Sequence, residues 1–444
     1  MTLRVAIVGS GPSGFYTADS LLRSVEAVEI DFIEKLPTPY GLIRGGVAPD
    51  HAKTKNVARS YEKTAGDPRV RYYGNVTLGT DIGLDALRGM YDAVVLATGA
   101  AIDRSLGIPG DDKAGVLGVA AFVGWYNGHP DFRDLDPPLD TGAVAVIGVG
   151  NVAVDVARVL TKTPDEMAAT DLTDYAAAAI HAAPIRDVYM FGRRAAHHAK
   201  FSNVELREMG QLEDSAPVLD PAEVPEDVPE DAAATMSDRD LRMIRRNLAT
   251  LRDFSGMAPG GRAKRVHFRF CASPVEILGG DRVEGIRMER TRIEGGRAVG
   301  TGETFDIACG LVIPAIGYFS EPVDGVPFDG GRSRNSDGRI EPGLYAVGWI
   351  KRGPSGVIGS NKPDGATAAE QIAGDCGNGS GKPGRRALEK HLQAHNIRYV
   401  PFDDWKRIEA AEEAAATPPA PRRKFGRVPE MLAVLDRPAA GAEN

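Results

Sequence analysis

The sequence predicts an α/β fold built on two doubly wound parallel sheets. Two glycine-rich segments carry this prediction: Gly9-Ser-Gly11-Pro-Ser-Gly14 and, 139 residues later, Gly148-Val-Gly150-Asn-Val-Ala153. Each follows an apolar run of strand type and opens a run of helix type. A strand, a glycine turn and a helix in this order are typical of a Rossmann-like dinucleotide-binding unit. The chain is therefore expected to contain two nucleotide sites.

Length and composition limit the classes of protein to consider. The chain has 444 residues, of which 43% are hydrophobic and 26% charged, as in an ordinary globular protein of two or three domains. A net charge of -8 argues against nucleic acid as the main partner. The three cysteines have no C-x-x-C spacing, which excludes a redox dithiol and a cluster held by four cysteines of this chain. With a strand-like start and no long apolar run, a cytoplasmic location without a membrane span is expected.

The first unit begins with the strand-like run Val5–Val8, followed by the first glycine segment and a helix to about Ser24. Gly9, Gly11 and Gly14 allow a tight turn and a close approach to a pyrophosphate, which the positive end of the helix attracts. The next strand ends at Glu34, whose carboxylate is placed to accept hydrogen bonds from a ribose. This acidic partner favours FAD at the first site.

The second unit repeats the pattern with a different ending. The strand Ala143–Ile147 leads through Gly148 and Gly150 into a helix, and a later strand ends at Gly192-Arg193-Arg194. No carboxylate stands there, and two guanidiniums can bind a 2'-phosphate, so the pattern favours NADP over NAD. An arginine pair is otherwise more often a solvated charge cluster.

The remaining segments are less specific. The acidic, proline-rich segment 213–231 is predicted to be a surface loop, and 241–252 a helix with exposed arginines. Two strand-like runs, 310–317 and 343–348, are expected to return the chain to the first domain. The glycine-rich segment 349–364 precedes a helix, so it either offers backbone N–H groups to a cofactor or is a mobile loop.

Two apparent motifs are rejected. Gly377–Pro383 is one residue short of a phosphate-binding loop and has proline where serine or threonine would bind magnesium. His391 and His395 are four residues apart without the glutamate of a zinc-binding helix. No metal site is therefore predicted, and residues 439–444 are expected to be disordered.

Taken together, the segments resemble the adrenodoxin reductase-like branch of the ferredoxin-NADP reductases, which includes the bacterial FprA-type enzymes. The matching stretches are Gly9–Tyr16, Pro39–His51, Trp125–His129, Gly148–Asp155, Gly192–Arg194, Glu205–Glu208, Gly348–Gly359 and Asp403–Trp405. The resemblance implies an FAD domain formed by residues 1–104 and 311–444, with an NADP domain, 105–310, inserted into it.

The resemblance also implies roles for individual residues. FAD contacts are expected from Ser13, Glu34, Leu42, Val76, Trp349, Gly356, Val357 and Ile358. NADP contacts are expected from Asn151, Val152, Ala153, Arg193, Arg194, Glu205 and Gly356. His51 and Glu208 correspond to a pair that acts near the flavin and the nicotinamide. The segment 195–203 departs from the expected Gly-Pro-rich run, and Lys200 there is a further candidate for a phosphate contact.

The implied activity is hydride transfer from NADPH to FAD, followed by release of single electrons to an iron-sulfur ferredoxin. Such partners are usually acidic, so the basic residues of 241–252 form a candidate docking patch or an ordinary exposed helix face: Arg242, Arg245, Arg246 and Arg252. Two alternatives are the flavin subunit of a glutamate-synthase-like complex, which the few cysteines oppose, and a non-catalytic FAD/NADP redox-sensing module. Loss of the flavin absorbance on addition of NADPH distinguishes a reductase from the non-catalytic redox-sensing module.

Overall fold

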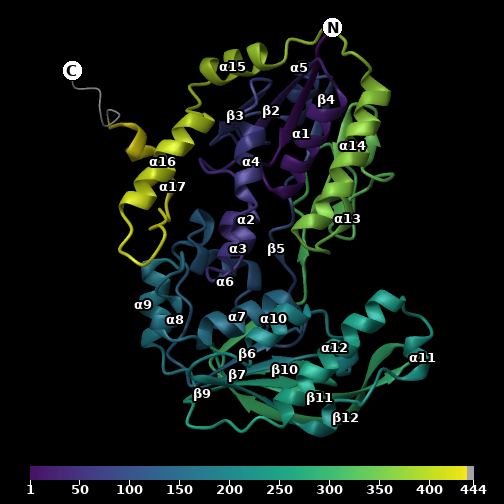
Figure 1. Cartoon of the computed structure of the whole chain (residues 1–444), viewed down its shortest axis with the longest axis vertical. Coiled ribbons are helices and arrows are strands. Elements are labelled where there is room, and N and C mark those ends of the chain that lie inside the picture. Colours follow the sequence, from purple (N-terminus) through teal and green to yellow (C-terminus); the bar gives the residue numbers. More distant parts are fainter. Residues whose placement is uncertain (438–444) are drawn as a thin grey trace. The chain divides into compact units, whose positions relative to one another are not determined.

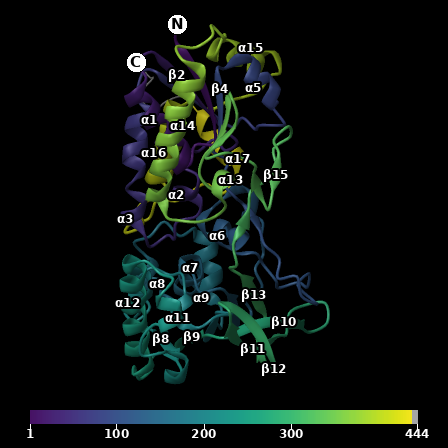
Figure 2. The same cartoon turned by 90° about the vertical axis from the view of Figure 1, so that its right-hand side faces the viewer.

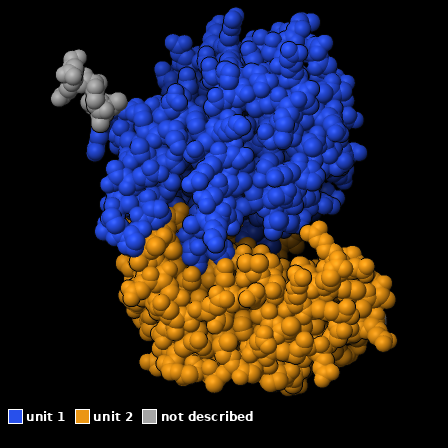
Figure 3. All heavy atoms as spheres, viewed as in Figure 1, with its two compact units in different colours: residues 1–102, 127–133, 317–444 blue, residues 103–126, 134–316 orange. Residues whose placement is uncertain are grey.

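The structure is a computed structural model that describes residues 1–437. The terminal residues 439–444, expected to be disordered, lie outside this range. Two units can be distinguished (Figure 3). Unit 1 comprises Met1–Ile102, Asn127–Arg133 and the chain from Gly317 onward, and unit 2 comprises Asp103–Tyr126 and Asp134–Ile316.

Unit 1 is built on a sheet with the strand order β17-β18-β4-β1-β2-β3. All neighbouring strands are parallel except β17 and β18, which are antiparallel. The strands are β1 (Leu3–Val8), β2 (Val28–Glu34), β3 (Val70–Gly74), β4 (Ala93–Leu96), β17 (Arg339–Glu341) and β18 (Leu344–Ala346). The sheet thus joins the N-terminal strands to two strands from the C-terminal third of the chain.

Both faces of this sheet are covered, as in a doubly wound fold. Along β1, Leu3, Val5 and Ile7 are buried in one core, whereas Ala6 and Val8 are buried in the other. The first core is covered by α1 (Pro12–Ser24), α4 (Ala58–Ala65), α14 (Asn361–Cys376), α16 (Phe402–Ala414) and α17 (Val428–Leu435). The second is covered by α5 (Leu84–Met90) and α15 (Arg385–Ala394). Burial on both faces explains the continuous apolar runs of these strands.

The helices α1 and α14 lie side by side on one face (Figures 1 and 2). A Cβ atom at Gly365 would lie 2.7 Å from the backbone nitrogen of Thr17, so glycine at this position permits the close crossing. A second contact lies near the starts of the helices, where a Cβ at Gly348 would lie 2.7 Å from the side chain of Ser13. The first turns of α1 and α14 are therefore brought to the same region of unit 1.

Unit 2 contains a parallel sheet with the order β13-β6-β7-β9-β8. Its strands are β6 (Ala143–Ile147), β7 (Asp187–Phe191), β8 (Ser215–Leu219), β9 (Lys264–Arg269) and β13 (Leu311–Pro314). One face packs against helices that include α7 (Asn151–Thr161) and α12 (Asp238–Ser255), and α10 (Asn203–Glu208) packs against both of these helices. The unit also contains α8 (Pro164–Met167), α9 (Asp174–Ala182) and α11 (Glu230–Ala233). It contains α6 (Val119–Asn127) as well, except for the last residue of that helix, Asn127, which is assigned to unit 1.

The other face of this sheet is covered by an antiparallel sheet. Its strands, in the order β10-β11-β12, are β10 (Ala272–Leu278), β11 (Gly285–Glu294) and β12 (Arg297–Ala308). Ile286 and Met288 of β11 share a core with Ala145 and Ile147 of β6. The predicted α/β class with parallel sheets is confirmed, and helices cover one face of the second sheet while strands cover the other.

Three segments differ from what the sequence predicted. Ser215–Leu219, predicted to belong to a surface loop, is the edge strand β8, where Pro217 is tolerated because an edge strand has one unpaired side. Leu311–Pro314, expected in the first domain, pairs in parallel with β6 of unit 2. Residues 127–133, expected in the second domain, lie in unit 1. Within residues 1–437, no helix is both long and apolar enough to cross a membrane.

Candidate functional site

The first glycine segment forms a tight turn between β1 and α1. Gly9 has a φ of +101°, and a Cβ there would lie 2.5 Å from the carbonyl oxygen of Ala97. A Cβ at Gly14 would lie 2.4 Å from the oxygen of Gly9, so this glycine permits α1 to pack closely on the strand. Gly11 precedes α1 without a side-chain cap, which leaves the N–H groups of the first turn to other acceptors. These positions match the three glycine roles of a dinucleotide-binding turn.

Glu34 stands at the end of β2, as predicted, and its carboxylate supports the glycine turn. Its Oε2 accepts hydrogen bonds from the backbone nitrogen of Ser10 at 2.9 Å and from the Ser10 hydroxyl at 2.7 Å. Its Oε1 accepts a hydrogen bond from the nitrogen of Leu36 at 3.2 Å. The carboxylate therefore holds the glycine turn in place. This structural role was not predicted, and it is additional to the predicted contact with a ribose.

A second loop approaches the glycine turn from Pro39 to Gly41. The Tyr40 nitrogen donates to the Ser10 oxygen at 3.0 Å, and a Cβ at Gly41 would lie 3.0 Å from the Cα of Gly11. Leu42 begins the short helix α2 (Leu42–Gly45) and is 44% exposed, so a bound cofactor can cover it. The Val76 side chain is instead buried in the core, and its backbone nitrogen donates to the backbone carbonyl of Glu34 at 2.9 Å.

The glycine-rich segment 348–361 is ordered by charged contacts. Asp364, in the first turn of α14, accepts a hydrogen bond from the Gly348 nitrogen at 3.1 Å and pairs with Lys351 at 3.1 Å and with Arg352. Arg352 also donates to the side-chain oxygen of Asn361 at 2.9 Å. These contacts hold the short helix α13 (Trp349–Arg352) against the start of α14. The alternative of a mobile loop is therefore not favoured.

The predicted cofactor residues of this segment lie around these contacts. The Trp349 ring stacks on Tyr318 at a centroid distance of 5.7 Å, and its Nε1 donates to the Ser355 oxygen at 3.2 Å. Gly356 has a φ of +85°. Val357 is 66% exposed, and Ile358 begins a single turn that leads into α14. Exposed apolar side chains beside a helix start can contact a flat ring system.

The second glycine segment repeats this geometry between β6 and α7. A Cβ at Gly148 would lie 2.4 Å from the oxygen of Ala315 at the end of β13. Gly150 precedes α7 without a side-chain cap, and a Cβ there would meet no atom within 4 Å, so a ligand can approach this backbone. Ala153 is buried, and the partly buried Val152 lies beside it in the first turn. The Asn151 Oδ1 accepts a hydrogen bond from the Ser202 nitrogen at 2.7 Å.

Arg193 and Arg194 follow β7, as predicted, and neither guanidinium has an ion-pair partner within residues 1–437. Their carbonyl oxygens accept hydrogen bonds from Thr291 at 2.8 Å and from the Cys271 nitrogen at 3.2 Å, which fixes the backbone. Burial and the nearby His197, Arg194 and Lys200 charges lower the pKa of His198 to about 4. The end of β7 is therefore a strongly positive region, suited to a phosphate group.

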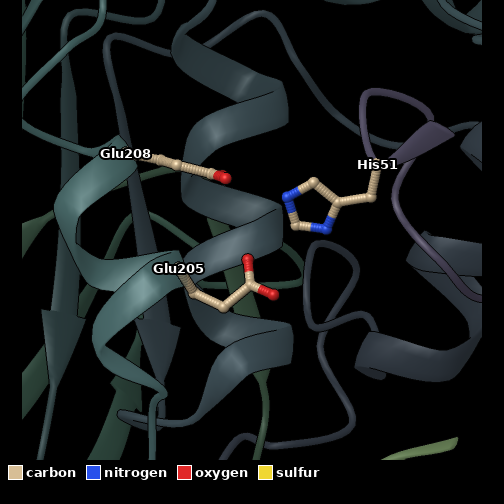
Figure 4. Close-up of side chains that lie close together, drawn as sticks. All are labelled: His51, Glu205 and Glu208. Atoms are coloured by element: carbon tan, nitrogen blue, oxygen red, sulfur yellow. The ribbon is translucent and has the colours of Figure 1, made fainter. Parts of the chain in front are cut away.

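Glu205 and Glu208 lie on α10, whose Ser202 cap accepts a hydrogen bond from the Glu205 nitrogen at 3.3 Å. Figure 4 shows both carboxylates extending from the same side of the helix. Figure 4 also draws His51, which precedes α3 (Ala52–Lys55) in unit 1. The His51 carbonyl accepts the N–H of Thr54 at 3.0 Å.

Near the nucleotide turns, sequence reasoning missed the buried charged residues Arg158 and Asp364. Arg158, on α7, is buried and lies near Glu205 and Glu208. Asp364 organises the start of α14. Burial of a charged residue cannot be read from a single sequence, although Arg158 and Asp155 stand among apolar residues of the helix, which is a weak signal.

Comparison with known proteins identifies the family. A family model described as pyridine nucleotide-disulphide oxidoreductase matches residues 3–190. The chain is 41% identical to NADPH-ferredoxin reductase FprA of Mycobacterium tuberculosis, over 97% of this chain and 98% of the relative. The chain belongs to the FprA and adrenodoxin reductase family. Within this family it is also 40% identical to the human mitochondrial NADPH:adrenodoxin oxidoreductase, over 98% of this chain and 92% of that protein.

The solved structures agree with this membership. Mycobacterium tuberculosis FprA in complex with NADPH matches the present structure with a TM-score of 0.93 and 40% identity. The match covers 98% of this chain and 99% of FprA. The resemblance identified in the sequence is therefore confirmed over nearly the whole chain.

Proposed function

We propose that this chain is an FAD-dependent NADPH-ferredoxin reductase. One observation carries the proposal: the side chains that follow the two glycine turns, at the end of β2 and just after β7, have opposite charges. The first is accompanied by the carboxylate of Glu34, and the second by the guanidiniums of Arg193 and Arg194, which have no ion-pair partner among the described residues. A carboxylate accepts hydrogen bonds from ribose hydroxyls, whereas two guanidiniums attract a 2'-phosphate. The first site is thus assigned to FAD and the second to NADPH.

The residues of unit 1 fit a bound FAD. The first turns of α1 and α14 supply N–H groups and the positive ends of two helices, which attract a pyrophosphate. Gly11 and Gly41 carry no side chain that would keep a ligand from the backbone. Leu42, Trp349 and Val357 supply partly or largely exposed apolar surface for the flavin ring. When bound, FAD can accept a hydride and release the two electrons singly, as an iron-sulfur acceptor requires.

The residues of unit 2 fit NADPH in the same way. The backbone around Gly150 is open to a pyrophosphate, and Asn151 to Ala153 form the first turn of α7. Arg193 and Arg194 select the nucleotide by its 2'-phosphate. His51 and Glu208 are proposed to act on the reacting rings, as in the family. Their role is to orient the nicotinamide and set the local charge, which accelerates transfer by positioning.

The proposed partner is an acidic iron-sulfur protein, and the candidate surface is α12. Arg242 and Arg246 are exposed on this helix, whereas Arg245 pairs with Asp227 at 2.9 Å and Arg252 donates to backbone oxygens of the acidic segment. Two of the four arginines are thus available for an acidic partner. The three free cysteines suit a reducing compartment, and the cytoplasm is the proposed location.

The test uses the full chain reconstituted with FAD. Anaerobic mixing with NADPH should bleach the flavin absorbance, and NADH should do so far more slowly. Reduction of cytochrome c by NADPH should then rise when a ferredoxin is added. A chain that binds FAD but is not bleached by NADPH would instead be a non-catalytic redox-sensing module.

A further inference from the structure

Arg158 forms the centre of a buried charge cluster in unit 2. Its side chain is 0% exposed. Nη2 lies 2.7 Å from Oδ1 of Asp155, one turn earlier on α7. Nη1 lies 3.5 Å from Oε2 of Glu205 and 3.4 Å from Oε2 of Glu208, both on α10. A buried guanidinium is costly unless carboxylates surround it, and here three carboxylates share one cation.

The helix α10 needs such an anchor. It has six residues, of which only Leu206 is buried, so neither its length nor its apolar contacts can hold it firmly. Its N-terminal end is fixed by the hydrogen bond between Ser202 and Asn151 of the glycine turn. Arg158 adds an ionic contact between α7 and the last turn of α10, because its Nη1 lies 3.4 Å from Oε2 of Glu208.

The guanidinium is suited to this task by its shape. Its planar fork presents several N–H donors in fixed directions, so one side chain can serve Asp155 at one end and two glutamates at the other. A lysine would supply the charge as a single point and could not serve all three carboxylates in this geometry. The side-chain exposures of Glu205 and Glu208, 19% and 36%, leave both carboxylates partly open to a ligand.

We propose that Arg158 is a positioning residue that holds Glu208, and Glu205 beside it, in the orientation used in the NADPH site. This inference rests on the proposed function, because it assigns Arg158 a role through Glu208. Arg158 itself does not touch the substrate, since its side chain is fully buried. Without the guanidinium, the repulsion between the two glutamates would not be offset by this cation, and the last turn of α10 would lose the ionic contact that Arg158 makes from α7.

The test is a double-mutant cycle with Arg158→Gln and Glu208→Gln in the FAD-loaded enzyme. The measured quantity is the rate of flavin bleaching at saturating NADPH. Each single variant is expected to slow bleaching about tenfold or more, and the double variant no further than the slower single variant. Losses that multiply in the double variant would overturn the proposal, because Arg158 would then act independently of Glu208.

A second measurement is independent of turnover. Hydrogen exchange of the backbone amides of α10 is expected to be faster in Arg158→Gln than in the parent, while exchange in α1 of unit 1 stays unchanged. The control is Arg287→Gln, which removes a partly exposed arginine of β11 that pairs with Glu276 of β10 and Asp306 of β12. This variant should leave the exchange of α10 unchanged. Unchanged exchange of α10 in Arg158→Gln would overturn the proposal.

Arg158→Lys keeps the test decisive if Arg158→Gln does not fold. Its bleaching rate is expected to lie between those of the parent and Glu208→Gln, and a parental rate with parental α10 exchange would overturn the proposal. A parental rate in Glu208→Gln would instead refute the role given to Glu208 under the proposed function. In that case α10 exchange alone decides whether Arg158 positions the helix.

Discussion

Replacing both arginines at the end of β7 tests the nucleotide assignment most directly. In the Arg193→Ala, Arg194→Ala double variant, the positive region at the second site loses two guanidiniums that have no ion-pair partner within residues 1–437. A hydrogen bond to a charged group contributes about 1.5–3 kcal/mol. Because Arg193 is exposed, we take the lower value for each, about 3 kcal/mol in all. This corresponds to about a 100-fold loss of kcat/KM for NADPH.

The same variant should change kcat/KM for NADH by less than about threefold, because NADH has no 2'-phosphate for the arginines to contact. The assay is steady-state cytochrome c reduction with each nucleotide, together with titration of NADP binding. Arg297→Ala, an exposed arginine at the β11–β12 turn of the same unit, is the control and should leave both values unchanged. An unchanged preference for NADPH, or an equal loss with both nucleotides, would refute the assignment.

Three further predictions follow from the geometry. Gly9→Ala should abolish FAD binding and lower the free energy of unfolding by about 2 kcal/mol or more, because its Cβ would meet the Ala97 oxygen at 2.5 Å. Gly79→Ala, with a similar φ of +90° but open space around it, should retain FAD, and loss of FAD in both variants would contradict the steric reason. The double variant Arg242→Glu, Arg246→Glu should slow ferredoxin-dependent cytochrome c reduction and leave the rate of flavin bleaching by NADPH unchanged. Slower bleaching with unchanged ferredoxin-dependent reduction would show that these residues do not belong to the docking surface. Burial, opposed by Arg385 and Tyr91, raises the pKa of Asp31 to about 6 from 3.8. A raised carboxyl pKa contributes stability that is present below pH 4 and lost as the pH rises through 6, by about 3 kcal/mol. Urea unfolding should therefore show Asp31→Asn gaining stability relative to the parent between pH 4 and pH 8, and a pH-independent difference would contradict the burial argument.

The nucleotide turns were predictable because their causes are local. Gly9 and Gly14 are required by the conformation of a few consecutive residues and by the packing of α1 on its own strand. Glu34 ends one of the following strands and Arg193 comes two residues after the other, and their opposite charges can be read directly from the order of residues. The helix predicted at 241–252 was also found, as part of α12. Its apolar residues recur at helical spacing, which is again a local property.

The strand assignments that failed depend on distant partners. The segment 215–219 contains proline and stands in an acidic stretch, and it becomes a strand because β9, about 50 residues later, offers a parallel edge. Likewise, 311–314 resembles the strands of unit 1 in its apolar character, and only its pairing with β6 decides that it belongs to unit 2. Pairing of this kind is decided by tertiary contacts, because a buried parallel strand is apolar in either sheet.

The sequence by itself determined the two nucleotide turns, the charge at the end of each and the family. The tertiary structure decided which buried charges support them. The Glu34 carboxylate accepts a hydrogen bond from Ser10 of the first glycine turn because β1 and β2 are neighbouring strands. Arg158 reaches Glu205 and Glu208 across nearly 50 residues because α7 and α10 pack together. A single sequence records the residue types, but the environment that makes a charge useful exists only when distant segments meet.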